Sequence, residues 1–79
     1  MPKVKYLERS VKISLYKKVW GNIEKYCSIY DINREKLAHI LHMDIRTVSI
    51  RKNKPERLLL CELYWFCDAV HIQIEDLFQ

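Results

Sequence analysis

The chain has few residues that break helices: only one glycine and two prolines occur among its 79 residues. Folds rich in loops or β-hairpins need turn positions with positive φ, which glycine accepts most readily. Leucine, isoleucine, lysine and glutamate, which favour helices, are frequent instead. The sequence therefore predicts one small all-α domain.

Long apolar runs are also absent, since no stretch approaches the ~18 residues that a membrane span requires. The first residues, MPKVKYLERSVK, carry charges throughout and do not resemble a secretory signal. We therefore expect no membrane association and a cytoplasmic location, either in a bacterium or in a phage-infected cell.

Catalytic and metal-binding patterns are missing too. The three cysteines, Cys27, Cys61 and Cys67, form no C-x-x-C pair, and a zinc site normally needs four clustered ligands. We expect buried free thiols in a reducing compartment. There is no glycine-rich phosphate loop and no Ser-His-acid arrangement, so we expect no enzyme, metal, cofactor or small-molecule ligand.

The net charge of +4 is distributed unevenly. Residues 1–57 contain fourteen Lys or Arg and six Asp or Glu, whereas residues 58–79 contain four acids and no Lys or Arg. A strongly basic region suits a polyanionic partner, whose phosphates it neutralises. A basic surface that is merely solvated is the alternative.

Apolar spacing and capping residues predict the order of the elements. Residues 1–14 lack a helical period and are expected to form an arm, with one short strand as an option, while residues 15–79 form the domain. Asn33 and Asp44 are expected to cap the second and third helices. Four helices are predicted at 15–28, 34–41, 45–53 and 58–70, with a last turn or short fifth helix at 74–78.

The corner between the second and third helices carries the functional argument. Two short helices joined by a three-residue turn form a helix-turn-helix. A small residue is needed where the helices cross, and Ala38 supplies it. Leu41, Met43 and an inward Val48 are expected to fill the space beneath the turn, so that the opposite side of the third helix projects outward.

The stretch NREKLAHILHMDIRTVSI resembles the helix-turn-helix of phage Cro and repressor proteins and their Xre-type relatives, which have the lambda-repressor-like fold. Their pattern is T-Q-x-x-L-A-x-x-L-G-V-S-x-x-T-I-S. The resemblance extends over residues 16–78 and includes N-K-P-E at 53–56 and A-V-H-I-Q-I-E-D-L-F at 69–78. It implies an all-α domain of four to five helices that binds DNA.

Three residues depart from that pattern. His42 and His71 replace glycines at two corners, where a histidine is tolerated if φ is positive. Arg51 stands where the family usually has Trp or Leu, so we expect its stem to pack and its head to reach outward.

DNA contacts follow from the direction of Val48. If Val48 points inward, the other side of the third helix meets the bases, and the family's base-reading positions agree with this. Arg46 suits guanine, Thr47 and Ser49 suit donors or acceptors on base edges, and apolar side chains suit a thymine methyl. The expected base contacts are Ile45, Arg46, Thr47, Ser49 and Ile50. The expected phosphate contacts, at helix starts and after the third helix, are Asn33, Arg34, Lys52, Asn53, Lys54 and Arg57.

The fourth helix is apolar on nearly all sides, which indicates burial on nearly all sides. We expect a homodimer that places two recognition helices about 34 Å apart on a pseudo-palindromic site. Coverage by the first helix and the arm is the alternative. The predicted interface consists of Leu59, Tyr64, Trp65, Phe66, Leu77 and Phe78.

These observations favour a sequence-specific, double-stranded DNA-binding transcriptional regulator, a repressor of phage or prophage type. One alternative is a protein-interaction module, such as an antitoxin-like regulator that uses its apolar helix at 58–70. Another is an RNA-binding or nucleoid-type protein that uses only the basic face.

Overall fold

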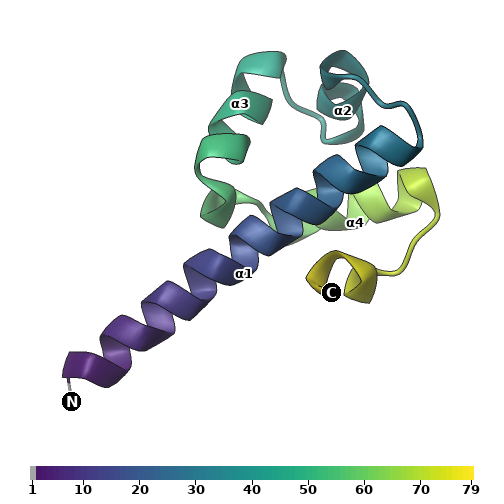
Figure 1. The fold of residues 1–79 in the computed structure, drawn as a ribbon. Helices are drawn as coiled ribbons and strands as arrows, with labels where there is room; N and C mark the ends of the chain where they lie inside the picture. The colour runs from purple at the N-terminus through teal and green to yellow at the C-terminus, as the bar shows by residue number, and fades with distance from the viewer. Residues whose placement is uncertain (1) are drawn as a thin grey trace.

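Four α-helices and two 3₁₀ turns follow one another in the computed structural model, which describes the backbone of residues 2–79 and the side chains of residues 14–79. No strand occurs in this described part, and the all-α class is confirmed. The elements are α1 (Pro2–Ile29), α2 (Arg34–Ile40), α3 (Ile45–Asn53), η1 (Pro55–Arg57), α4 (Leu60–Val70) and η2 (Ile74–Phe78) (Figure 1).

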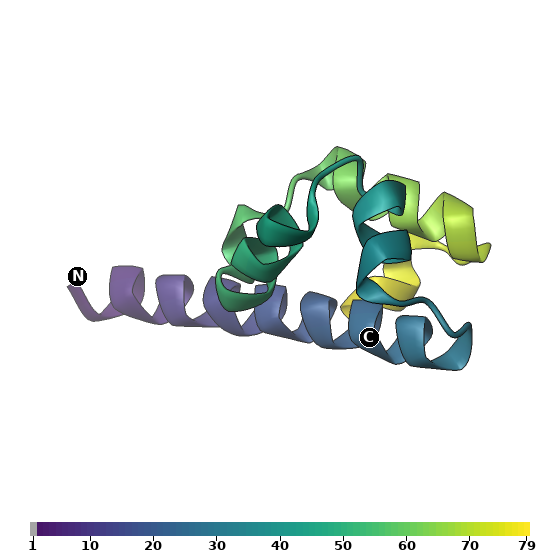
Figure 2. The same ribbon diagram turned by 90° about the horizontal axis from the view of Figure 1, so that it is seen from above.

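The first helix corrects the prediction of an arm over residues 1–14. Residues 2–14 are helical and continuous with the rest of α1, and Met1 lies outside the described residues. Pro2 is compatible with a first helical turn, and no glycine occurs before Gly21. The N-terminal half of α1 extends past the other helices (Figure 2).

None of the helices in the described part is both long enough and apolar enough to cross a membrane. The 28 residues of α1 have the necessary length, but lysines and other charged residues interrupt them throughout.

Local capping residues set the starts of α2 and α3, as predicted. The Asn33 Oδ1 accepts a hydrogen bond from the Lys36 backbone N–H at 2.8 Å, and the Asp44 Oδ1 accepts one from the Thr47 N–H at 2.7 Å. Each side chain satisfies a backbone donor that has no partner within the first helical turn. These two caps fix the residues at which α2 and α3 begin.

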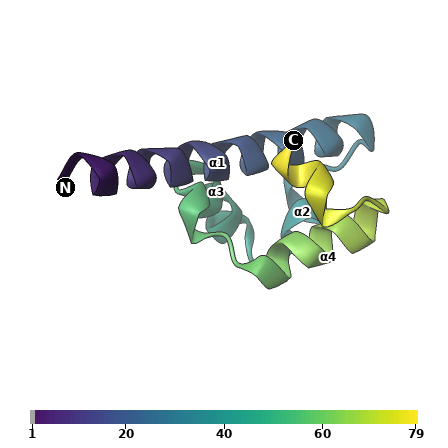
Figure 3. The same cartoon turned by 90° about the horizontal axis from the view of Figure 1, so that it is seen from below.

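The core lies between α1 on one side and α2, α3 and α4 on the other. Figure 3 shows α1 and α4 on opposite sides of the body, with η2 returning from α4 to α1. The Asn22 side-chain amide donates a hydrogen bond to the Leu77 carbonyl at 2.8 Å and holds η2 on α1. The buried hydrophobic residues are Val19, Trp20, Ile23, Leu37, Ala38, Leu41, Val48, Leu58, Leu63, Phe66, Cys67, Val70 and Leu77.

The corner between α2 and α3 is packed as predicted. Ala38, Leu41 and Val48 are buried, and the half-buried Met43 packs against the same core. The Met43 N–H donates to the Ala38 carbonyl at 3.0 Å, which closes the turn. These contacts fix the direction in which α3 leaves the corner.

Three residues other than glycine adopt positive φ in this fold. His42 and His71 have φ of 55° and 58°, so both corners where the related pattern has glycine do use the left-handed region. Asp31, at 58°, is a third such position that the sequence did not indicate. Histidine and aspartate are among the residues enriched in this region, so the corners form without glycine.

The fourth helix is buried on one side only, which corrects part of the predicted dimer interface. Phe66 and Leu77 are fully buried within the same subunit and cannot contact a second copy. Cys61 is exposed and Cys27 half-buried, although all three thiols were expected to be buried. The helix begins at Leu60 rather than at residue 58, because the η1 turn and an extended Leu58 precede it.

Candidate nucleic-acid interface

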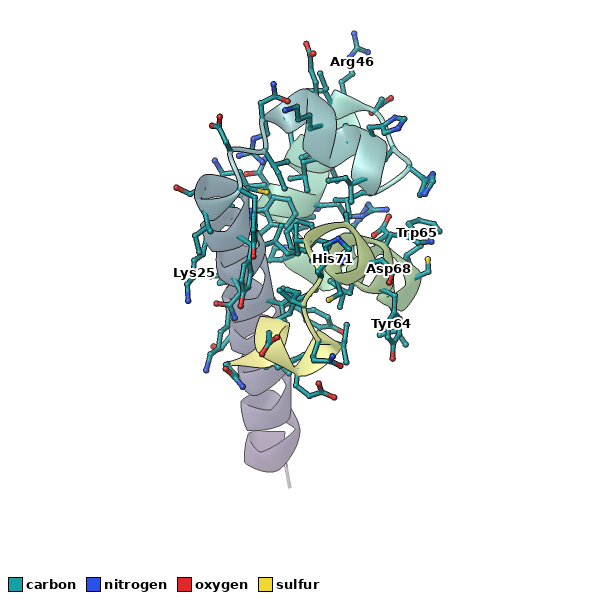
Figure 4. All side chains as sticks on the ribbon, turned by 90° about the vertical axis from the view of Figure 1, so that its right-hand side faces the viewer. Lys25, Arg46, Tyr64, Trp65, Asp68 and His71 are labelled. Atoms are coloured by element: carbon teal, nitrogen blue, oxygen red, sulfur yellow. The ribbon has the colours of Figure 1, made fainter. Side chains whose placement is uncertain are left out.

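The outer side of α3 is accessible, as its predicted role requires. Val48 points into the core, while Arg46, Ser49 and Ile50 are exposed and Thr47 is half-buried. Figure 4 shows Arg46 projecting from one end of the molecule, away from α1. The five predicted base-contacting residues, Ile45, Arg46, Thr47, Ser49 and Ile50, thus share one short helix whose orientation is fixed by packing.

A groove of about 560 Å³ lies between α2 and the start of α3. Its lining combines the acids Glu35 and Asp44 with His39 and Arg46, and its floor includes Ala38. The small Ala38 side chain lets the two helices approach each other closely. The groove therefore borders the predicted base-contacting side of α3. It places hydrogen-bond donors and acceptors along one edge of that side.

Asp44 at this edge is held in its charged form. The Thr47 backbone N–H, together with the Thr47 hydroxyl, lowers the pKa of Asp44 below its ordinary value, and the positive charge of Arg46 acts in the same direction. Hydrogen bonds to a carboxylate stabilise its ionised form. The cap at the start of α3 is therefore stronger when Asp44 is ionised.

This dependence predicts an acid-sensitive corner. Because the pKa of Asp44 is lower in the folded chain than in the unfolded chain, its stabilisation is fully present above the unfolded value of 3.8. The stabilisation disappears as the pH falls through the lower folded value. The free energy of unfolding can be measured with urea between pH 6 and pH 2.5, which is about two units above and one unit below the ordinary pKa. It should fall more steeply with decreasing pH for the wild type than for Asp44→Asn. The asparagine still caps the helix but does not titrate; identical pH dependence in the two chains would contradict the assignment.

The end of α3 and the residues after it form a basic, exposed segment. Lys52, Asn53, Lys54 and Arg57 are all exposed, and none of the three cations takes part in an ion pair among the described side chains. The segment runs from the last turn of α3 into η1, which packs against α1. Four of the six predicted phosphate-contacting residues are thus free to reach a backbone beside α3.

The other two predicted phosphate contacts are partly occupied within the protein. The Arg34 guanidinium lies 3.1 Å from the Glu24 carboxylate and also sits over the Trp20 ring, 6.0 Å from its centroid. The Asn33 side-chain oxygen is used as the cap of α2. Arg34 therefore ties α1 to α2 as well as facing solvent, with 42% of its side chain exposed.

The Arg51 guanidinium points inward and not outward as predicted. Its Nε and one terminal nitrogen lie 3.2 and 3.3 Å from the two Glu62 carboxylate oxygens, and only 17% of its side chain is exposed. Glu62 is itself buried and also accepts a hydrogen bond from the Leu59 N–H at 2.8 Å. The guanidinium is therefore a tie between α3 and α4 and not a surface cation.

The sequence did contain a signal for this pair. Glu62 stands at the third position of α4, from which a glutamate can accept from the backbone N–H of the residue that precedes the helix. It is also one of only two acids, with Asp68, in a helix whose other residues are apolar. An acid at this position and a basic residue where the related pattern has an apolar one are both candidates for burial, but only the packing of α3 against α4 pairs them.

The thiols and histidines of the described part of the chain do not cluster as metal ligands. No group of three or more His, Cys, Asp or Glu side chains there lies close enough together to hold a metal ion. Burial raises the pKa of Cys27 and of Cys67, which favours their protonated forms. Protonated thiols are poor nucleophiles and poor metal ligands.

Comparisons with protein-family models, curated proteins and solved structures returned no match to this chain. The functional interpretation therefore rests on the geometry of α3 and its surroundings.

Proposed function

We propose that this chain is a sequence-specific, double-stranded DNA-binding regulator with a helix-turn-helix of the lambda-repressor-like type. One observation carries the proposal: buried Val48, Ala38 and Leu41 hold α3 in place, while its opposite side presents Arg46 and Ser49 to solvent. A helix supported in this way can enter the major groove with its first turns against the base edges.

The side chains of α3 suit distinct parts of a base pair. The Arg46 guanidinium can donate two hydrogen bonds to the O6 and N7 of guanine, and the Ser49 hydroxyl can donate or accept. The exposed side chains of Ile45 and Ile50 can pack on thymine methyl groups. Lys52, Lys54 and Arg57 can neutralise phosphates beside the groove.

A regulator of this kind acts by occupying promoter DNA. We therefore include repression, of the type found in phages and prophages, in the proposal, together with action inside the bacterial or phage-infected cell. A homodimer is part of it because two-fold related half-sites require two reading helices. The part of the predicted dimer surface that remains exposed consists of Leu59, Tyr64, Trp65 and Phe78.

Selection of bound duplexes from a random pool, followed by titration of single variants, tests the proposal. Arg46→Ala should lose about 1–3 kcal/mol of binding free energy at one base pair and bind other bases there equally well. Lys54→Ala should weaken binding to every duplex by a similar factor, because a phosphate contact carries no sequence information.

Arg46→Lys is the matched control for this experiment. It keeps the positive charge but loses the two-pronged donor geometry, so it should behave like Arg46→Ala in specificity and retain more overall affinity. If Arg46→Ala and Lys54→Ala weakened all sequences in the same way, the assignment of Arg46 to base reading would be wrong. If no duplex were enriched, the proposed function itself would fail.

The exposed apolar side of α4 favours a second candidate function, a protein-interaction module of the antitoxin type. Leu60, Tyr64 and Trp65 are all exposed on this helix. In that case variants on α3 would leave the biological activity unchanged and variants on α4 would abolish it.

A further inference from the structure

The tilt of α3 depends on contacts near the two ends of the helix. Its one fully buried side chain, Val48, lies near the middle of Ile45–Asn53. A single buried residue decides which side of a helix faces the core, but the helix can still pivot about that point. The contacts at the ends of α3 therefore decide where Arg46 and Ser49 are held.

The last turn of α3 is held on α4 by an ion pair. The Arg51 guanidinium donates hydrogen bonds to both carboxylate oxygens of the buried Glu62, at 3.2 and 3.3 Å. Two hydrogen bonds between a planar guanidinium and a planar carboxylate fix the direction of the pair as well as its distance. This contact therefore restrains the C-terminal end of α3 relative to α4.

A second contact with α4 lies at the corner that precedes α3. The rings of His42 and Trp65 meet edge to face, with centroids 4.4 Å apart and planes inclined by 68°, which is a geometry that aromatic pairs favour. Figure 4 shows Trp65 leaving α4 on the side nearer Arg46, and Tyr64 leaving it on the other side. Glycine, which the related pattern has at this corner, could not supply such a contact.

The two residues of α4 that receive these contacts share one side of that helix. Glu62 and Trp65 are three positions apart, a spacing that places side chains one turn apart on the same side. Their partners, His42 and Arg51, are two of the three residues that depart from the related helix-turn-helix pattern. Both departures therefore supply contacts between α4 and the two ends of the α3 region.

We propose that His42 and Trp65 are positioning residues, which set the tilt at which α3 presents Arg46 to the base edges. The inference rests on the proposed function and assigns to it a source of specificity that need not touch DNA. A changed tilt moves the Arg46 guanidinium away from the two acceptors of a guanine. The flexible basic side chains after α3 can still reach phosphates. Loss of the contact should therefore reduce discrimination between sequences more than affinity for DNA in general.

The ratio of the dissociation constants for a random duplex and for the selected duplex measures this discrimination. Trp65→Leu removes the ring but keeps an apolar side chain, and it should lower the ratio about threefold to tenfold, the factor that one aromatic pair contributes. The dissociation constant for the random duplex should stay unchanged. Trp65→Phe retains a ring and should keep most of the ratio. Tyr64→Leu is the matched control, because it removes a ring from the other side of α4 and should leave the ratio unchanged.

The reciprocal variant is His42→Asn. Asparagine also accepts positive φ, so the corner keeps its backbone conformation and loses only the ring. This variant should lower the ratio as Trp65→Leu does, and the double variant should lower it no further, because both changes remove the same contact. All titrations are made at a temperature where circular dichroism shows the variants folded. An unchanged ratio in Trp65→Leu, or losses that multiply in the double variant, would overturn the proposal.

Amide hydrogen exchange of the free protein tests the same contact without DNA. The Met43 N–H closes the corner on the Ala38 carbonyl at 3.0 Å, and the Ile32 N–H closes the turn before α2 on the Cys27 carbonyl at 2.8 Å. Trp65→Leu should speed exchange at Met43 about threefold to tenfold and at Ile32 much less, because only the corner loses its support. Equal acceleration at both amides would indicate a general loss of stability and overturn the proposal. If no duplex were selected, the proposed function would fail, whereas acceleration confined to Met43 would still show that Trp65 holds the corner.

Discussion

Replacing Glu62 with alanine is expected to lower the free energy of unfolding by about 3 kcal/mol. Removing one partner of a buried ion pair typically costs about 3–5 kcal/mol, because the remaining charge stays desolvated. Partial exposure of Arg51 places the expected value near the lower end of that range. The same change removes the acceptor of the Leu59 N–H at the start of α4. Urea unfolding followed by circular dichroism measures the loss.

Two further variants separate the contributions to this loss. Glu62→Gln keeps an acceptor for the Leu59 N–H but removes the negative charge, so its destabilisation should fall between that of wild type and alanine. The double variant Arg51→Met with Glu62→Met removes both charges and should recover most of the stability. A loss below about 1 kcal/mol for Glu62→Ala would mean that the pair behaves as an exposed one.

Phe66→Ala should destabilise the chain by about 3–5 kcal/mol, the range typical of large cavities in a packed core. Phe66 is fully buried within one subunit, so the loss should not depend on protein concentration. Tyr64→Ala, two residues away and half exposed, is the matched control and should cost under about 1 kcal/mol in dilute solution. A concentration-dependent effect of Phe66→Ala would place the side chain at a subunit interface instead.

The starts of α2 and α3 could be predicted because their signals are local. Asn33 and Asp44 each cap a helix through the backbone N–H three residues later, and this spacing can be read directly from the sequence. The inward direction of Val48 followed from the same short stretch. The exposure of Arg46 and Ser49 then needed no information from the rest of the chain.

Which side of α4 is buried could not be predicted, because the helix is apolar on nearly all sides. Phe66 and Trp65 are neighbours with similar hydrophobicity, yet one is fully buried and the other is exposed. The packing of α2 and η2 against α4 decides which side of the helix is covered. A hydrophobic pattern gives a direction only where polar residues interrupt it.

The two ion pairs were missed for a related reason. Arg34 pairs with Glu24 and Arg51 with Glu62, over separations of 10 and 11 residues. Both pairs connect different helices, so their formation depends on how the helices pack and not on helical spacing. For this reason, a count of arginines in the sequence overestimates the number of guanidinium groups that are free in solvent.

The inward orientation of Arg51 has a consequence for binding to any polyanion. The Arg51 guanidinium is neutralised by the buried Glu62 carboxylate, so it would not displace cations condensed on a nucleic acid. The ion pair between Arg34 and Glu24 reduces the contribution of Arg34 in the same way. Each phosphate contact made by a free cation steepens the fall of affinity with added electrolyte by about one unit on a double-logarithmic plot. In the proposed complex with DNA, the internal ties therefore make affinity less sensitive to ionic strength than a count of fourteen basic residues suggests.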